Sequence, residues 1–208
     1  MNIDNVKQIK KLDTGLVSES IESLPDQIEH LLNEVKDIKI PSSYKKVSNI
    51  VLNGMGGSNH GARIIRSAMK NRMKYSIAIT PGYVVPKHIS KDTLDIVSSY
   101  SGTTEEPLSV FRELKKRKAK VLAITAGGKL EKIMKKDNIP GLVFSPTTNP
   151  SNQSRLGLGY SIFGLILLMN KIGLVKVTKK EMLDIIESLR KQNKSLTISS
   201  TTTKNAAK

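Results

Sequence analysis

The sequence of 208 residues contains no cysteine, which excludes a disulfide framework and thiolate metal sites. It also lacks a long apolar run: the longest, Ile162 to Met169, includes a glycine and is well short of the ~20 residues that cross a bilayer. The N-terminus does not show the basic-then-apolar plan of a signal peptide. We therefore expect a cytoplasmic protein without a membrane partner, in which the apolar run forms a buried helix.

Acidic and aromatic residues are also few. Against 34 Lys and Arg there are 18 Asp and Glu, and the net charge of +16 is compatible with nucleic acid, a membrane surface or small anionic substrates. The basic residues crowd into Arg112 to Lys120 and Lys129 to Lys136, both spaced as solvated helix faces. Because only 4% of the residues are aromatic and none is Trp, a stacking platform for single strands is missing. We therefore rank solvated faces ahead of nucleic-acid binding and expect no nucleic-acid partner.

The middle of the chain alternates short β-rich runs with helical stretches. With 38% hydrophobic residues, the chain can bury one ample core as a single domain with short appendages. The alternation predicts an α/β three-layer sandwich, in which helices flank both faces of a five-stranded parallel sheet. The predicted strands are Asn49 to Leu52, Tyr75 to Thr80, Leu94 to Ser99, Val121 to Thr125 and Gly141 to Phe144.

Helical patterns surround these strands. An amphipathic helix opens at Pro25, after a polar and weakly patterned segment of residues 1–24. The other predicted helices are Gly61 to Lys70, Pro107 to Lys118, Lys129 to Lys136, about Ser154 to Asn170, and Lys179 to Arg190. We expect an N-terminal segment with its helix at 1–40, the main domain at 41–195 and a tail at 196–208.

The end of the first predicted strand carries the glycine-rich sequence GMGGS, residues 54–58. It is not a dinucleotide fingerprint, because Asn59 stands where the third glycine belongs and no acid follows the second strand. The turn still allows a ligand to approach the backbone of Gly56 and Gly57. Ser58 either contacts that ligand or caps the following helix.

The end of the third predicted strand carries hydroxyls. Ser99, Ser101 and Thr104 fall within one turn, and Gly102 permits an unusual backbone conformation there. Three hydroxyls next to the positive end of a helix are typical of a phosphate-binding site, whereas a capping turn needs only one. A third segment, residues 153–157, places Arg155 at the start of the long apolar helix, where it is a candidate partner for an anion or oxyanion.

Other polar residues give weaker signals. His60 follows the glycine turn, and Glu105 and Glu106 flank the hydroxyl turn, but surface, packing or helix-end roles are favoured for them. No histidines have metal-ligand spacing and no Ser/His/Asp order suggests a hydrolase. We expect neither a metal nor a cofactor.

Three sequences together resemble a known family: GMGGS, SYSGTTEE and PSNQSRLGLGYSIFGLILLM. They are similar to the sugar isomerase (SIS) domain, and more narrowly to the bifunctional phosphoglucose/phosphomannose isomerases, over about residues 20–190. The resemblance implies a flavodoxin-like fold. It also implies that Ser58, Ser99, Ser101 and Thr104 bind the sugar phosphate, with the backbone of Gly56 and Gly57 close to the substrate, and that Arg155 stabilises an enediolate.

The same resemblance implies aldose–ketose isomerisation of glucose 6-phosphate, fructose 6-phosphate or mannose 6-phosphate. In that family two SIS domains follow each other in one chain, which dimerises. The second half supplies a Glu, a His and a Lys for proton transfer. This sequence is expected to correspond to the first half, without the catalytic base, so its own enzymatic activity is left open. Its expected partner is a second copy or a second SIS half.

Two alternatives stay open. The chain could be a stand-alone phosphosugar-binding or sensing module, or a single-domain isomerase of another sugar phosphate, working as a homo-oligomer. A basic nucleic-acid-binding protein ranks last, because no helix-turn-helix precedes the sheet. The sequence does not determine which sugar phosphate is bound, and it does not assign a role to His60.

Overall fold

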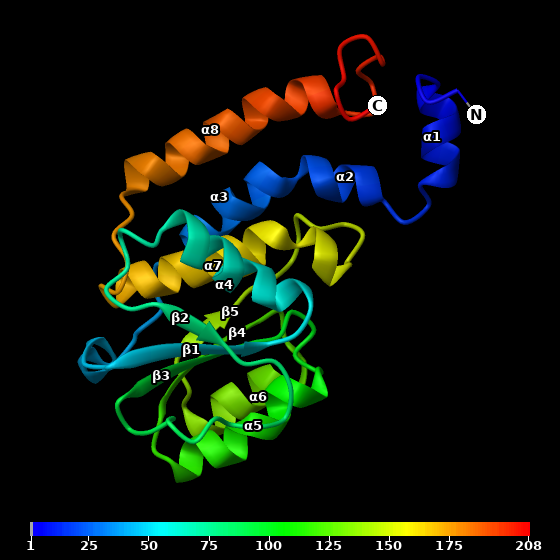
Figure 1. Cartoon of the computed structure of the whole chain (residues 1–208). Helices are drawn as coiled ribbons and strands as arrows, with labels where there is room; N and C mark the ends of the chain where they lie inside the picture. Colours follow the sequence, from blue (N-terminus) through cyan, green and yellow to red (C-terminus); the bar gives the residue numbers. More distant parts are fainter. Residues whose placement is uncertain (1) are drawn as a thin grey trace.

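A five-stranded parallel sheet forms the centre of the computed structural model, which describes residues 2–208 (Figure 1). Its strand order is β2-β1-β3-β4-β5, and each neighbouring pair is parallel. The strands are β1 (Asn49–Gly54), β2 (Ile77–Ile79), β3 (Thr93–Ser98), β4 (Lys120–Thr125) and β5 (Gly141–Val143). The predicted α/β fold with a flavodoxin-like sheet is confirmed, and the strand order reverses between β1 and β3.

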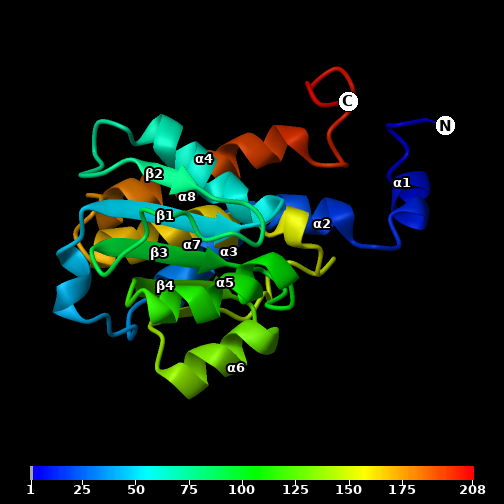
Figure 2. The same cartoon turned by 60° about the horizontal axis from the view of Figure 1, so that its bottom comes forward.

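Helices cover both faces of this sheet (Figures 1 and 2). One face carries α3, α4 and α7, with α8 lying on α3, while α5 and α6 cover the other face. The helices are α1 (Val6–Leu12), α2 (Val17–Glu22), α3 (Leu24–Glu34), α4 (Gly57–Ala68), α5 (Glu105–Lys116), α6 (Gly128–Asp137), α7 (Leu158–Lys171) and α8 (Lys179–Leu196). Two short 3₁₀ helices, η1 (Ser42–Lys45) and η2 (Ser154–Leu156), complete the elements.

The three central strands, β1, β3 and β4, are buried on both faces, which explains their continuous apolar runs. Leu94 and Ile96 of β3 face the core under α3, α4 and α7, and Val97 faces the core under α5 and α6. The apolar run expected to form a buried helix lies in α7, which packs against α3, α4 and the sheet. Helix α4 crosses α7 at Gly61, and the two helices are so close that a methyl group on Gly61 would lie 2.6 Å from the Ser161 carbonyl oxygen.

The structure corrects several expected boundaries. Residues 1–24, expected to be weakly patterned, contain α1 and α2. Sequence periodicity missed them because α1 buries none of its residues and α2 buries only Ser20. Helix α4 begins four residues earlier than predicted, since Gly56 precedes it with φ +51°. Ser58 therefore lies inside the first turn of α4, and the interpretation of Ser58 as the N-cap is wrong.

Two sets of contacts hold the long helix α8, one at its N-terminus and one about three turns further along. Its N-cap Thr178 and Glu181 form a reciprocal capping box. Further along, Arg190 contacts Asp26 at 2.7 Å and Glu29 at 2.6 Å, which ties α8 to α3. Throughout residues 2–208, none of the helices combines the length and the apolar character that a membrane span requires.

Candidate functional site

The carboxyl ends of β1, β3 and β4 meet at one edge of the sheet, beside the point where the strand order reverses. Open α/β sheets bind ligands at this place. The turns after β1 and β3 are in direct contact, because the Oγ atom of Ser58 accepts a hydrogen bond of 3.3 Å from the backbone N–H of Tyr100. Gly54 is also tightly enclosed: a methyl group there would lie 2.9 Å from the Ser98 carbonyl oxygen.

The turn after β3 gathers the three predicted hydroxyls. Ser99 Oγ donates to Thr104 Oγ1 at 3.0 Å and accepts from the backbone N–H of Gly102 at 3.1 Å. Ser101 Oγ accepts from the backbone N–H of Thr103 at 3.3 Å. Gly102 has φ +64°, and a side chain there would collide with the carbonyl oxygen of Gly127. Glycine is therefore required where the turn passes under the segment after β4.

Helix α5 starts directly after this turn and is not capped by a side chain. Thr104 is its N-cap residue, but the Thr104 hydroxyl accepts from Ser99 and makes no capping bond. The first N–H groups of the helix have no intrahelical acceptor and carry partial positive charge. The turn thus offers hydroxyls and an open helix N-terminus on the same side, which is an arrangement suited to a phosphate group.

The segment after β5 brings Arg155 to the glycine turn. A methyl group on Gly57 would lie 3.6 Å from the Ser154 carbonyl oxygen and 3.9 Å from the Arg155 Cα atom. The 3₁₀ helix η2 therefore lies directly on the GMGGS turn. Arg155 is exposed, and among the described residues its guanidinium forms neither an ion pair nor a side-chain hydrogen bond. Its charge is available to an anion at this edge.

Two buried side chains that the sequence analysis did not single out hold η2 in place. Gln27 of α3 is fully buried, and its Nε2 donates to the Leu156 carbonyl at 2.9 Å while its Oε1 accepts from the Gly159 N–H at 3.0 Å. Asn149, also buried, donates to the Tyr100 hydroxyl at 2.7 Å. Burial raises the pKa of Tyr100, and the hydrogen bond from Asn149 opposes that change. A glutamine on the apolar face of a predicted helix was the only sequence signal for this contact.

The candidate acids and bases lie around this turn. His60 is exposed, and its Nδ1 lies 3.0 Å from the carbonyl oxygen of Gly56. Glu105 Oε2 accepts from the Tyr83 hydroxyl at 3.4 Å. Desolvation first, and then the negative charge of Glu106 and Glu105, raises the pKa of Tyr83. No group of three potential metal ligands occurs within residues 2–208.

A further carboxyl group lies in the sheet itself. Asp95 of β3 is fully buried, and Asn53 Nδ2 donates to both of its oxygens at 2.7 and 2.8 Å. Asn53 Oδ1 in turn accepts from the Thr80 hydroxyl at 2.7 Å. Burial raises the pKa of Asp95 to about 7, against the opposing effect of the Asn53 hydrogen bonds. At the start of the predicted strand Leu94 to Ser99, Asp95 reads from the sequence as a solubilising turn charge, and this interpretation is wrong because the side chain is fully buried.

The doubly wound parallel sheet brings glycine turns, hydroxyls and an open helix N-terminus together at its carboxyl edge. This arrangement defines an α/β anion-binding domain. The chain is a SIS-domain protein, since residues 43–135 match the SIS domain family. It is 35% identical to the bifunctional phosphoglucose/phosphomannose isomerase of Caldicellulosiruptor bescii over 85% of this chain and 52% of that protein. The isomerase of the same name from Thermoplasma volcanium is 33% identical over 70% of this chain and 45% of that protein.

Solved structures show the same fold. Tagatose-6-phosphate ketose/aldose isomerase from Escherichia coli has a TM-score of 0.59 at 15% identity, covering 89% of this chain and 52% of that chain. The C-terminal domain of glucosamine-fructose-6-phosphate aminotransferase from Francisella tularensis has a TM-score of 0.58 at 14% identity. The match covers 86% of this chain and 53% of that chain. The predicted family and fold are confirmed. The chain spans about half the length of the curated relatives that it matches.

Proposed function

We propose that the carboxyl edge binds a sugar phosphate, and that the chain forms the first half of a phosphoglucose/phosphomannose isomerase. One observation carries the proposal: Ser99, Ser101 and Thr104 surround the uncapped N-terminus of α5. Hydroxyls and free N–H groups match the acceptor oxygens of a phosphate. The relatives named phosphoglucose/phosphomannose isomerase support this choice of ligand.

In this proposal each site residue has a separate role. Ser58, Ser99, Ser101 and Thr104 hold the phosphate. The backbone of Gly56 and Gly57 lies close to the sugar, with open space beside Gly56. Isomerisation moves a proton between C2 and C1 through an enediolate, whose negative charge Arg155 offsets. The proton needs a general base, which the family resemblance assigns to the second half rather than to His60, Glu105 or Glu106. We therefore assign the base to a second SIS half.

The domain boundaries and the partner follow from this assignment. Residues 41–195 form the phosphosugar-binding domain, 1–40 pack beside it, and 196–208 lead toward the second half. The substrates are glucose 6-phosphate, fructose 6-phosphate and mannose 6-phosphate, and the expected compartment is the cytoplasm. No cofactor takes part, because the proton transfer needs only acid, base and oxyanion groups.

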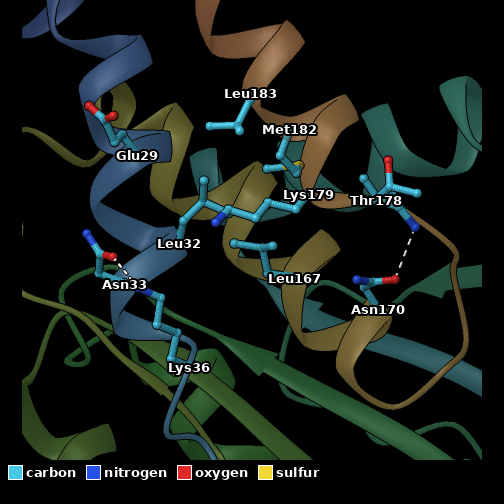
Figure 3. Close-up of a pocket in the computed structure, with 11 residues that line it drawn as sticks. Glu29, Leu32, Asn33, Lys36, Leu167, Asn170, Thr178, Lys179, Met182 and Leu183 are labelled. Carbon is cyan, nitrogen blue, oxygen red and sulfur yellow. Dashed lines mark hydrogen bonds between the residues drawn. The ribbon is translucent and has the colours of Figure 1, made fainter.

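A groove between α3, α7 and α8 supports contact with a further SIS domain (Figure 3). It has a volume of about 410 Å³, and Figure 3 shows Met182 and Leu183 of α8 above Leu32 and Leu167. Leu183 is 44% exposed. We propose that a second copy of the chain covers this groove when no second half does, forming a homodimer through the same surface on both copies.

The test of the proposed function is binding together with turnover. Calorimetry on the purified chain should show weak binding of glucose 6-phosphate and fructose 6-phosphate, and no binding of glucose, because the contacts are made to the phosphate. A coupled assay should detect no isomerisation at a rate typical of the family. Robust turnover would contradict the assignment of the base to a second half and would favour a single-domain isomerase. Equal affinity for glucose would overturn the phosphate site.

A further inference from the structure

The positive charge of this protein is concentrated at the amino edge of the sheet, opposite the candidate site. Because all strands are parallel, the segments that precede them meet at that edge. These five segments are residues 44–48, 69–76, 87–92, 115–120 and 135–140. They contain fourteen Lys and Arg but only two Asp. Most of the net charge of +16 therefore lies at one edge of the molecule.

Contacts confirm that these segments lie together. Lys120 Nζ donates to the carbonyl oxygens of Lys46 at 2.9 Å and Lys91 at 2.7 Å. The Tyr44 hydroxyl donates to the Val121 carbonyl at 3.3 Å. Three segments that are distant in the sequence thus form one continuous surface, on the left side of the sheet in Figure 2, at the tails of the strand arrows.

Sugar-phosphate binding does not account for this charge. The segments that follow the strands, at the carboxyl edge, are residues 55–58, 80–86, 99–106, 126–129 and 144–157. They contain two basic residues, Lys129 and Arg155, and two acidic ones, Glu105 and Glu106. Helix C-termini favour one or two cations each, through the helix dipole. The excess of twelve charges in these five segments is more than the C-termini of α4, α5 and α6, the helices that end in them, require.

The basic edge also contains an amphipathic groove between α5 and α6. It has a volume of about 610 Å³. Its floor is apolar and includes Leu108, Phe111, Ile133 and Ile139. Its rim is basic and includes Arg112, Lys115, Lys118 and Lys136. Lys115 contacts Asp137 at 3.2 Å.

The rim still has charge to offer a partner. Arg112, Lys118 and Lys136 are exposed and form no ion pair with any residue that the structure describes. A ligand that fits this groove must therefore present apolar groups to its floor and negative charge to its rim.

We propose that the amino edge docks an acidic, amphipathic segment of a partner protein, whose apolar side chains fill the α5–α6 groove while its carboxylates meet the basic rim. Helices that lie in such grooves use this combination. A second copy of this chain does not fit, because it carries the same positive edge. Nucleic acid fits less well, because its phosphates leave the apolar floor uncovered and Phe111, the aromatic side chain of the floor, is only 8% exposed.

The experiment uses three labelled probes and fluorescence anisotropy on the full chain. The first probe is a helical peptide with Glu on one face and Leu on the other, the second is polyglutamate of equal charge, and the third is a short DNA duplex. We expect the Glu/Leu peptide to bind at least about tenfold more tightly than either of the others. Its affinity should fall as the salt concentration rises from about 50 to about 300 mM, because part of the attraction is screened.

Charge reversal then locates the binding surface. The double variant Arg112→Glu/Lys136→Glu should weaken binding of the Glu/Leu peptide by about tenfold or more. The control Lys180→Glu/Lys191→Glu changes the net charge equally on exposed positions of α8 and should stay within about twofold of the parent chain. A third variant, Ile133→Asn, should remove only the preference for the Glu/Leu peptide over polyglutamate.

Several results would overturn the proposal. Tighter binding of the DNA duplex would make the edge a nucleic-acid surface, and equal binding of polyglutamate would show that the groove has no role. Equal effects of the rim and control variants would place the contact elsewhere. The melting temperature is measured in every variant, and its retention shows that each variant is folded. This surface lies away from the sugar site, so loss of the proposed sugar function would leave the docking result intact.

Discussion

The hydroxyl of Tyr100 accepts a hydrogen bond of 2.7 Å from Nδ2 of Asn149, and this contact joins the turn after β3 to the segment after β5. The backbone N–H of Tyr100 also donates to Ser58 Oγ, in the turn after β1. Asn149 Nδ2 makes a second bond, to the Gln153 carbonyl at 3.0 Å, two residues before Arg155. One residue therefore connects the three segments that form the candidate site.

We predict that Tyr100→Phe lowers the free energy of unfolding by about 1–2 kcal/mol, because buried Asn149 loses one of its acceptors. Sugar-phosphate binding should weaken as well, since the segment after β5 that carries Arg155 is then held less firmly. Urea unfolding and calorimetry measure the two effects. Tyr44→Phe is the matched control: it removes a hydrogen bond to the Val121 carbonyl at the amino edge and should leave binding unchanged. Unchanged binding in Tyr100→Phe would contradict the positioning role.

A second prediction concerns the hydroxyls of the proposed phosphate site. Ser101→Ala and Thr104→Ala should each weaken sugar-phosphate binding by about 1–3 kcal/mol, the range for a hydrogen bond to a charged group. The melting temperature of Ser101→Ala should barely change, because Ser101 is exposed, whereas Thr104→Ala also removes the acceptor of the buried Ser99 hydroxyl and should lower the melting temperature slightly. Ser109→Ala removes an exposed hydroxyl further along α5 and serves as the control. Equal losses of stability and binding would instead indicate a purely structural turn.

The fold and the location of this site were predictable for a common reason. Strands that are buried on both faces leave continuous apolar runs, and parallel strands bring all their carboxyl ends to one edge. Ser99, Ser101 and Thr104 could therefore be placed together from their positions after a strand. The start of α4 could not be predicted from the sequence, because it depends on the left-handed backbone of Gly56, with φ +51°.

Long-range polar contacts were the least predictable part. Gln27 reaches Leu156 across a sequence separation of 129 residues, and a local pattern carries no information about that partner. Asp95 and Asn53 pair between neighbouring strands, so the acid could not be distinguished from a strand-end charge before the sheet was known. The short helices α1 and α2 bury only Ser20 between them, so burial does not define them, whereas local hydrogen bonds such as that from the Gln8 N–H to Asn5 Oδ1 do.

Asp95 should make the stability of the protein depend on pH. Its pKa is raised to about 7 in the folded chain from 3.8, so between these values the folded chain holds a proton that the unfolded chain has released. Stability should therefore be highest at the acidic end of this window and fall as the pH rises toward 7, by up to about 1.4 kcal/mol per pH unit from this group alone. Above the folded pKa the loss is complete and stays constant.

The variant Asp95→Asn tests this pH dependence, because an amide does not ionise. Its melting temperature relative to the parent chain should increase between about pH 5 and about pH 8. Asp92→Asn, which changes an exposed acid close by, should track the parent chain at every pH. A parent chain whose stability is flat or rises through this window would show that burial of Asp95 does not favour its protonated form.

The last prediction concerns association through the groove between α3, α7 and α8. Leu183 and Ile185 are 44% and 37% exposed on α8, and the chain spans only about half the length of its curated relatives. A homodimer that covers this surface should bury about 1,200–2,000 Å² in total. Light scattering after size exclusion should show a dimer at moderate salt. At low salt the fraction of dimer should fall, because a charge of +16 on each copy opposes the contact until it is screened.

Leu183→Glu locates the contact, because it places one charge at the centre of each half of a two-fold interface and should shift the chain to a monomer. Ile64→Glu is the matched control: Ile64 is also 44% exposed but lies on α4, outside the lining of the groove. If both variants and the parent chain are monomers at micromolar concentration, the apolar groove is stable in water and the pairing is wrong. If only Ile64→Glu dissociates the dimer, the copies meet through α4 instead.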